Sequence, residues 1–186
     1  NDSIAIGRIG SFHVEGREII ARDLPLQEGV FTRGSPPRTI DLNGEHEAEQ
    51  MYVQFVQLAE PKAKYPLLMW HGGGMTGVTW EDTPDGRPGW QLTFLRNGHD
   101  VYVSDAVERG RASWCCVPGV YEGSVVTRTK QECWEGFRCG PAGSWDPDPA
   151  KRKAYDGQRF PVDAIDAFHR QTVPRWTTSD VPTQRA

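Results

Sequence analysis

Three glycines directly after a short apolar segment constrain this chain more than any other feature. The apolar segment, residues 65–69, leads into the sequence WHGGG. Glycine adopts positive φ without strain and lets another group approach the main chain closely. The pattern therefore predicts a buried strand over 67–70 that opens into a loop. Backbone N–H groups of such a loop can converge on one point, as the oxyanion hole of an acyl-transfer enzyme requires, and Gly73 and Gly74 are the candidate donors.

The order of elements around this loop indicates an α/β fold. A helix is expected over 90–97, because Gly98 suits the position just beyond a helix C-terminus. A strand is expected over 100–104. Strand, loop, helix and strand in this order form the crossover unit of a parallel sheet. We therefore expect a mostly parallel sheet with covering helices.

Further elements are expected on both sides of this unit. Residues 9–21 alternate around a Glu-Gly-Arg turn as an N-terminal β-hairpin would, and residues 51–58 have the period-two alternation of a strand with one buried and one exposed face. Residues 161–172 fit a helix with proline in its first turn. The stretch 109–149, rich in Cys, Trp, Gly and Pro, predicts a lid-like excursion over a binding site. Residues 174–186 are expected to form a mobile tail.

Composition excludes several classes of function. The formal net charge is −4 and the basic residues are dispersed, which leaves no positive surface for nucleic acid. No apolar run reaches the roughly 20 residues that span a bilayer, so no membrane insertion is expected. The cysteine-rich region lacks histidine, and its adjacent cysteines are poorly spaced for a tetrahedral zinc site. We therefore predict no metal and no cofactor.

The cysteines and the N-terminus bear on the compartment. All the cysteines fall within one short stretch, as Cys115, Cys116, Cys133 and Cys139. Three pairings are possible if all four join, and a bridge between the two adjacent cysteines would be strained. We predict at least one disulfide that joins the adjacent pair to Cys133 or Cys139. Asn1 begins the glycosylation sequon Asn-Asp-Ser. Together these cues favour a secreted or extracytoplasmic protein.

The residues after the glycine loop resemble a known family. Residues 71–90 read HGGGMTGVTWEDTPDGRPGW, which is similar to the HG-x-x-x-TG-x-TWE-x-TPDGR-x-GW signature of a group of microbial esterases in the α/β-hydrolase superfamily. Shorter similar blocks run through nearly the whole chain. The resemblance implies a serine hydrolase whose glycine loop supplies half of the oxyanion hole. The nucleophile would lie in a G-x-S-x-G elbow, which is absent from the 186 residues.

The absent nucleophile leads to two hypotheses about function. In the first, residues 1–186 are the N-terminal part of one α/β-hydrolase domain, and a companion C-terminal chain of the same precursor carries the Ser-acid-His triad. The companion would cover a sheet edge otherwise left unpaired. The substrate would be a small-molecule ester, and the assembled enzyme could form a homodimer. A truncated or nicked product is the other source of such a chain. In the second hypothesis, the chain is a non-catalytic binding or regulatory subunit with a degenerate hydrolase fold.

Three side chains near the loop allow competing interpretations. His71 is expected to anchor the glycine loop by hydrogen bonds rather than to act as a catalytic base. Trp80 and Trp90 are candidates for the wall of a substrate pocket, since pockets are largely apolar and aromatic. Core packing accounts for both tryptophans equally well.

Two acidic residues follow the strand at 100–104. Asp105 and Glu108 lie where α/β sheets place ligands, at the carboxyl edge. A triad acid here would contradict the chain order of the resembling family. We therefore expect them to cap loops or to pair with Arg109 or Arg111.

Overall fold

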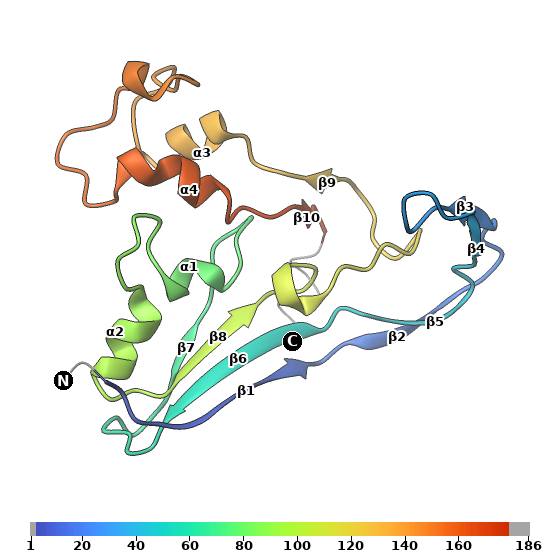
Figure 1. The fold of residues 1–186 in the computed structure, drawn as a ribbon, viewed down its shortest axis with the longest axis horizontal. Helices are drawn as coiled ribbons and strands as arrows, with labels where there is room; N and C mark the ends of the chain where they lie inside the picture. The colour runs from blue at the N-terminus through green and yellow to red at the C-terminus, as the bar shows by residue number, and fades with distance from the viewer. Residues whose placement is uncertain (1–2, 179–186) are drawn as a thin grey trace.

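The fold is built on a four-stranded sheet, to which a long ribbon and a set of short helices are attached (Figure 1). The structure is a computed structural model and describes residues 3–178. The strand order in the sheet is β1-β6-β8-β7. These strands are β1 (Ile6–Val14), β6 (Met51–Leu58), β8 (Val101–Asp105) and β7 (Leu67–Met69).

The sheet is mixed rather than mostly parallel. β1 pairs with β6 and β6 with β8 in antiparallel fashion, and within residues 3–178 only β7 and β8 pair in parallel. The expectation of a mostly parallel sheet is therefore wrong for this part of the protein. The predicted strand-helix-strand unit is confirmed, because β7 and β8 flank the helices α1 (Val78–Glu81) and α2 (Trp90–Arg96). The other strands join through a ribbon that needs no crossover helix.

The N-terminal strands do not form the hairpin predicted for residues 9–21. Instead, two further antiparallel pairs extend the β1–β6 pair outward. They consist of β2 (Arg17–Ala21) with β5 (Gly44–Ala48), and of β3 (Gln27–Gly29) with β4 (Arg38–Ile40). The register that aligns Val14 with Met51 continues beyond the gap, where Arg17 faces Ala48.

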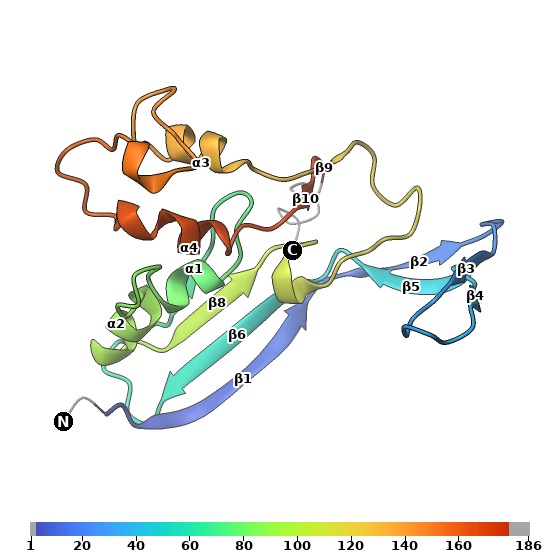
Figure 2. The same cartoon turned by 45° about the horizontal axis from the view of Figure 1, so that its top comes forward.

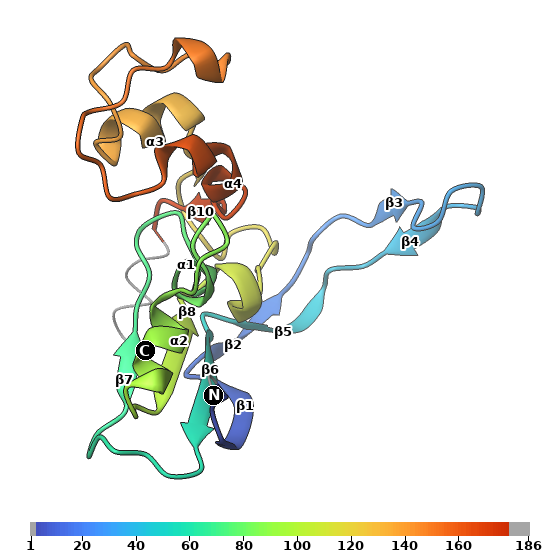
Figure 3. The same ribbon diagram turned by 60° about the vertical axis from the view of Figure 1, so that its left-hand side comes forward.

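These strands therefore make one long ribbon whose turn lies near residues 30–37. Glu15 and Gly16, the predicted hairpin turn, both have positive φ, and so does Glu49 on the opposite strand. This backbone geometry separates the β1–β6 pair from the β2–β5 pair without reversing the chain. Figure 3 shows the outer part of the ribbon projecting away from the rest of the molecule. Phe31 at its tip is 73% exposed.

The main core lies between the sheet and α2. Val56, Val101 and Val103 pack with Met69 and with Leu95 of α2. Every side chain of β6 is buried or half-buried. The exposed face predicted for this strand is therefore absent.

The end of α2 follows its prediction closely. Gly98 has φ +88°, its N–H donates to the C=O of Leu95 (3.0 Å), and the His99 N–H donates to the C=O of Phe94 (3.1 Å). This is the Schellman arrangement, in which a glycine in the left-handed region closes the helix. It turns the chain directly into β8.

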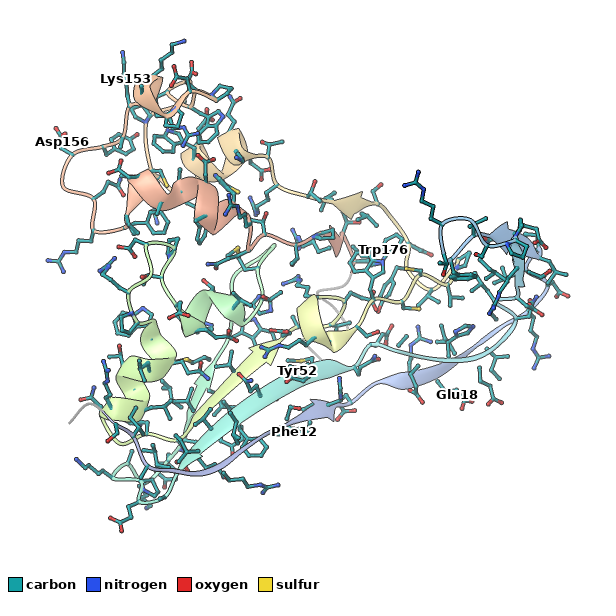
Figure 4. The ribbon with its side chains drawn as sticks, viewed as in Figure 1. Phe12, Glu18, Tyr52, Lys153, Asp156 and Trp176 are labelled. Carbon is teal, nitrogen blue, oxygen red and sulfur yellow. The ribbon has the colours of Figure 1, made fainter. Side chains whose placement is uncertain are left out.

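Short helices from the second half of the chain lie beside α1 and α2 (Figure 2). We call residues 130–169, which contain these helices and the loops between them, the helical unit. Its helices are α3 (Lys130–Gly136), η2 (Pro149–Lys151), η3 (Val162–Ala164) and α4 (Ile165–His169). They pack around Trp134, Cys139 and Ile165. The helix predicted over 161–172 is present as η3 and α4 but ends earlier. Lys153 and Asp156 mark the end of the unit farthest from the sheet (Figure 4).

The remaining segments connect the helical unit to the sheet. η1 (Gly110–Ala112) follows β8, and β9 (Val125–Val126) pairs with β10 (Arg175–Trp176). Trp176, which Figure 4 labels, stacks against both Trp114 and Tyr121. Two residues of the expected tail, Arg175 and Trp176, thus take part in regular pairing. Residues 179–186 lie outside the described part of the chain, as does Asn1 of the sequon.

The predicted disulfides are absent, because Cys115, Cys116, Cys133 and Cys139 are all free thiols. Cys115 packs with Ile19 and Ala48 against the ribbon, whereas Cys139 packs in the helical unit. The two halves of the predicted bridge therefore belong to separate clusters, and a disulfide requires much closer approach. Burial raises the pKa of the Cys115, Cys133 and Cys139 thiols, which makes them less reactive.

Replacing Gly98 with alanine tests the closing turn of α2. A Cβ atom at Gly98 would lie 2.6 Å from Cβ of Lys62, whereas one at Gly34, which has φ +83°, would meet nothing within 4 Å. We expect Gly34→Ala to lower the free energy of unfolding by about 1 kcal/mol through backbone strain alone. Gly98→Ala should cost about 2–4 kcal/mol, because crowding adds to that strain. Urea denaturation measures both, and equal losses would contradict the crowding.

Candidate functional site

The glycine loop begins where β7 ends and has the geometry of a tight turn. Met75 N–H donates to the C=O of Gly72 at 3.2 Å, and Gly74 has φ +73°. Positive φ at the third position, but not at Gly73, is the pattern of a type II turn, which favours glycine there. The C=O of Gly74 accepts a hydrogen bond of 2.9 Å from Val173 N–H, so the segment after α4 holds the loop from outside.

The N–H groups of Gly73 and Gly74 have no hydrogen-bond acceptor within residues 3–178. A Cβ atom added to Gly73 would meet only Nη2 of Arg128, at 4.0 Å, and one added to Gly72 would meet nothing within 4 Å. Adjacent N–H groups in a loop with open space beside it can donate to a negatively charged oxygen. The loop is therefore a candidate oxyanion hole.

His71 fixes the base of the loop to the end of β8. The side chain is 3% exposed, its Nε2 accepts the N–H of Ala106 at 3.0 Å, and its Nδ1 lies 2.8 Å from the C=O of Gly72. Because Nε2 is an acceptor, the proton resides on Nδ1 and is donated to Gly72. Both ring nitrogens are engaged in the loop's own structure. The predicted anchoring role of His71 is confirmed.

Asp105 ties the far side of the loop to the same strand end. Its Oδ1 accepts Gly77 N–H at 2.7 Å, and its Oδ2 accepts both the N–H and the Nε–H of Arg111 at 2.9 Å. The absence of a side chain at Gly77 is necessary, since a Cβ atom there would collide with Val103. The predicted pairing of Asp105 with Arg111 is confirmed. The Arg111 guanidinium also lies 4.5 Å from the centre of the Tyr52 ring on β6 (Figure 4).

Two effects act on the Asp105 carboxyl in opposite directions. Burial favours its neutral form, because the side chain is 1% exposed. Hydrogen bonds from the Arg111 side chain, the Arg111 N–H and the Gly77 N–H outweigh burial and hold the pKa of Asp105 below its ordinary value. Asp105 is therefore an ionised structural group and not a proton carrier.

Glu108 caps the loop that leads into the cysteine-rich segment. It has positive φ, is 3% exposed, and accepts the N–H of Cys115 at 2.7 Å and the hydroxyl of Tyr121 at 3.1 Å. Burial raises the pKa of its carboxyl above the ordinary value. The expectation of a loop cap is confirmed.

A cavity of about 720 Å³ separates α1 and α2 from the helical unit. Trp80 and Trp90 both line it, and the opposite wall includes Phe137, Phe160 and Phe168. Trp80 also packs against the main core, as the core-packing interpretation of that residue predicts. Trp90 is 57% exposed. The glycines of the loop are not part of the lining, so the cavity does not contain the candidate oxyanion hole. The lining does include Thr79, shortly after the loop, and Gln171, two residues before the Val173 that bonds to Gly74.

The sequence patterns did not identify Arg128, which lies against the glycine loop. A Cβ atom added to Gly74 would meet its Cδ and Nε at 3.5 Å. Arg128 precedes α3, in the stretch where no motif was visible. The only local signal is the residue after Arg128. This is Thr129, whose side chain accepts the N–H of Glu132 and caps α3.

Within residues 3–178, no group of three or more His, Cys, Asp or Glu is arranged to hold a metal ion. In the same residues, no helix has the length and apolar character to cross a membrane.

Replacing Asp105 with asparagine tests the link between loop and strand. Because the folded pKa is depressed, the stabilisation is present above the unfolded value near 3.9 and is lost as pH falls through the folded pKa. We expect Asp105→Asn to lower the free energy of unfolding by about 2–3 kcal/mol at neutral pH. The difference from the parent should shrink below about pH 4.

Chemical denaturation at several pH values measures both the free energy of unfolding at neutral pH and its change with pH. Glu81→Gln is the matched control, because Glu81 lies 3.7 Å from Arg111 but both side chains are about one-third exposed. It should cost little at any pH. A pH-independent loss in Asp105→Asn would contradict the role of the ionised carboxylate.

The known proteins that this chain resembles are a lipase and an esterase. No family model matches the chain. A probable secreted lipase, phiG, from Fungal sp. (strain ATCC 74256) is 40% identical over 79 residues, or 42% of this chain and 21% of the lipase. A bacterial esterase solved at atomic resolution matches with a TM-score of 0.77 and 31% identity, over 97% of this chain and 55% of the esterase chain. The chain thus spans about half the length of this solved relative, is similar to lipases and esterases, and has an α/β fold with a mixed sheet.

Proposed function

We propose that this chain is part of a serine-type carboxylic ester hydrolase and supplies the oxyanion loop together with part of the substrate pocket. The observation that carries the proposal is the pair of N–H groups at Gly73 and Gly74 that have no acceptor among residues 3–178, in a turn fixed by His71. Donors held in place before the reaction stabilise a developing oxyanion without reorganisation. The similarity to an esterase and a lipase supports the same chemistry.

In this proposal the nucleophile and its acid and histidine partners lie on a companion C-terminal chain of the same precursor. No G-x-S-x-G sequence is present in the 186 residues, and the bacterial esterase extends well beyond the matched region. The edge of the sheet supports the idea. Within residues 3–178, β7 pairs with β8 alone, and the neighbouring apolar side chains Tyr65 and Leu68 are 69% and 77% exposed. An uncovered apolar edge strand is unfavourable, and a strand from the companion would cover it.

The cavity beside the loop is the proposed site for an apolar part of the ester. Trp80 and Trp90 form one wall, and aromatic residues of the helical unit form the other. The excursion at 109–149 then acts as a wall or lid, since its end packs into the helical unit. A secreted location fits the fungal relative, which is described as a secreted lipase.

Activity that depends on the companion is the first test. We expect the purified chain alone to show no hydrolysis of short aryl esters, because it contains no serine elbow. The preparation that includes the companion should hydrolyse them. Release of para-nitrophenol measures both, and intact mass under denaturing conditions shows whether a companion is present. Turnover by the refolded chain alone would overturn the assignment of the nucleophile.

Replacing Gly73 with valine tests the loop itself. Because a Cβ atom at Gly73 has only Arg128 Nη2 near it, valine fits the folded chain and crowds only the incoming carbonyl. We expect kcat of the assembled enzyme to fall by a factor of about 10² to 10³, as when one oxyanion donor is lost. Gly136→Val is the control, since a Cβ atom there meets nothing within 4 Å and the position lies away from the glycine loop, at the end of α3. An unchanged kcat in folded Gly73→Val protein would remove the loop from the mechanism.

A further inference from the structure

Arg128 brings a positive charge to the candidate oxyanion loop. Its Cγ, Cδ and Nε lie 3.5–3.8 Å from a Cβ position at Gly74, and its Nη2 lies 4.0 Å from that at Gly73. The side chain therefore extends along the two residues whose N–H groups find no acceptor in the described part of the chain. Its side chain is 32% exposed, so the guanidinium is both held by the protein and accessible.

Two contacts fix the orientation of this guanidinium. Glu132, one helical turn away on α3, forms an ion pair with Nη1, and the cation lies 5.9 Å from the centre of the Phe137 ring. Both contacts come from the helical unit and neither involves Nη2. The nitrogen nearest to Gly73 thus keeps donors that the described residues do not use.

This placement defines what a bound ester would meet. If the scissile carbonyl oxygen accepts from Gly73 and Gly74, as the proposed function requires, a substituent of the ester passes beside Nη2. Guanidinium groups bind carboxylates with paired, charge-assisted hydrogen bonds. Partial exposure allows such a carboxylate to enter without the cost of complete desolvation.

We propose that Arg128 is a specificity-determining residue that binds a carboxylate carried by the ester substrate, so that the enzyme prefers anionic esters over neutral ones of the same length. The inference rests on the proposed function and adds to it a substrate class. Glu132 competes for the same guanidinium and moderates the preference. Arg128 acts on recognition of the substrate and not on the bond-breaking step.

The test compares two esters that differ in one charged group. Para-nitrophenyl hydrogen adipate carries a carboxylate at the far end of its acyl chain, and para-nitrophenyl hexanoate does not. On the assembled enzyme, we expect Arg128→Gln to lower kcat/KM for the adipate ester by about tenfold and to leave the hexanoate ester within about twofold. Glu132→Gln should raise the preference for adipate. Added salt should weaken the preference in the parent but not in Arg128→Gln.

Arg138→Gln is the matched control, since it removes the same charge from the helical unit at an exposed position. It should leave both esters unchanged. Equal losses of kcat on both esters in Arg128→Gln would mean that the guanidinium stabilises the transition state, which overturns the specificity role. No change on either ester would also overturn it.

Binding of the para-nitroanilide of adipate, which the enzyme does not cleave, is measured by calorimetry. This measurement separates failure of the proposed esterase function from failure of the proposed anion site at Arg128. Hydrolysis with no charge preference, and anilide binding unaffected by Arg128→Gln, would refute the anion site and leave the proposed function standing. Absence of hydrolysis in every variant, with anilide binding that weakens in Arg128→Gln, would refute the esterase function and leave the anion site standing.

Discussion

The ionised carboxylate of Asp105 is the interaction on which the site depends. It terminates β8, receives the N–H of Gly77 at one end of the glycine loop, and receives Arg111 from the segment that follows. His71 adds a second link at the other end of the loop, through Ala106. A loop with consecutive glycines has high conformational entropy when free, so a fixed shape requires such external constraints. The rigid end of β8 provides them.

The outer surface of the loop is constrained by a different part of the chain. Val173 holds the C=O of Gly74, and Arg128 covers the same residue with its aliphatic carbons. Both belong to the region after residue 109, which contributes short helices and much irregular backbone. The sheet therefore fixes the position of the loop, while the helical unit determines which chemical groups surround it. Changes in that unit can alter the surroundings of the loop without disturbing its anchoring.

Local signals predicted those parts of the molecule that local interactions determine. The strand before the loop and α2 with its Gly98 closure follow from short-range patterns. The positions of His71 and Asp105 beside a glycine loop and a strand end indicate structural roles, but their partners Ala106 and Gly77 lie 35 and 28 residues away and are set by tertiary structure. The hairpin at 9–21 was mispredicted because a Glu-Gly pair with positive φ can interrupt a strand as well as reverse it. Pairing with β6 decided between the two outcomes, and a pairing partner forty residues away leaves no mark on the local pattern.

Other features depended on tertiary structure in the same way. The cysteines are close in sequence but separate into two hydrophobic clusters, because the chain between Cys116 and Cys133 crosses from the ribbon to the helical unit. α3 was missed although Thr129 and Glu132 give a cap signal, since its seven residues are too few to show a periodic face. Arg128 could not be identified from the sequence, because only the folded structure places it beside Gly73 and Gly74.

The antiparallel pairing along the long ribbon also favours one order of folding. Gly29 and Arg38 are close in sequence, so pairing at the tip closes a short loop at little entropic cost. Each pair formed there shortens the loop that the next pair must close, down to Val14 and Met51 and on to the first residues of β1. The most distant contacts of the sheet can therefore form by zipping from the tip, with no search over the whole intervening chain. On this route the part of the ribbon farthest from the candidate site is the first to form, and it delivers β6 in register to the strand that ends at Asp105.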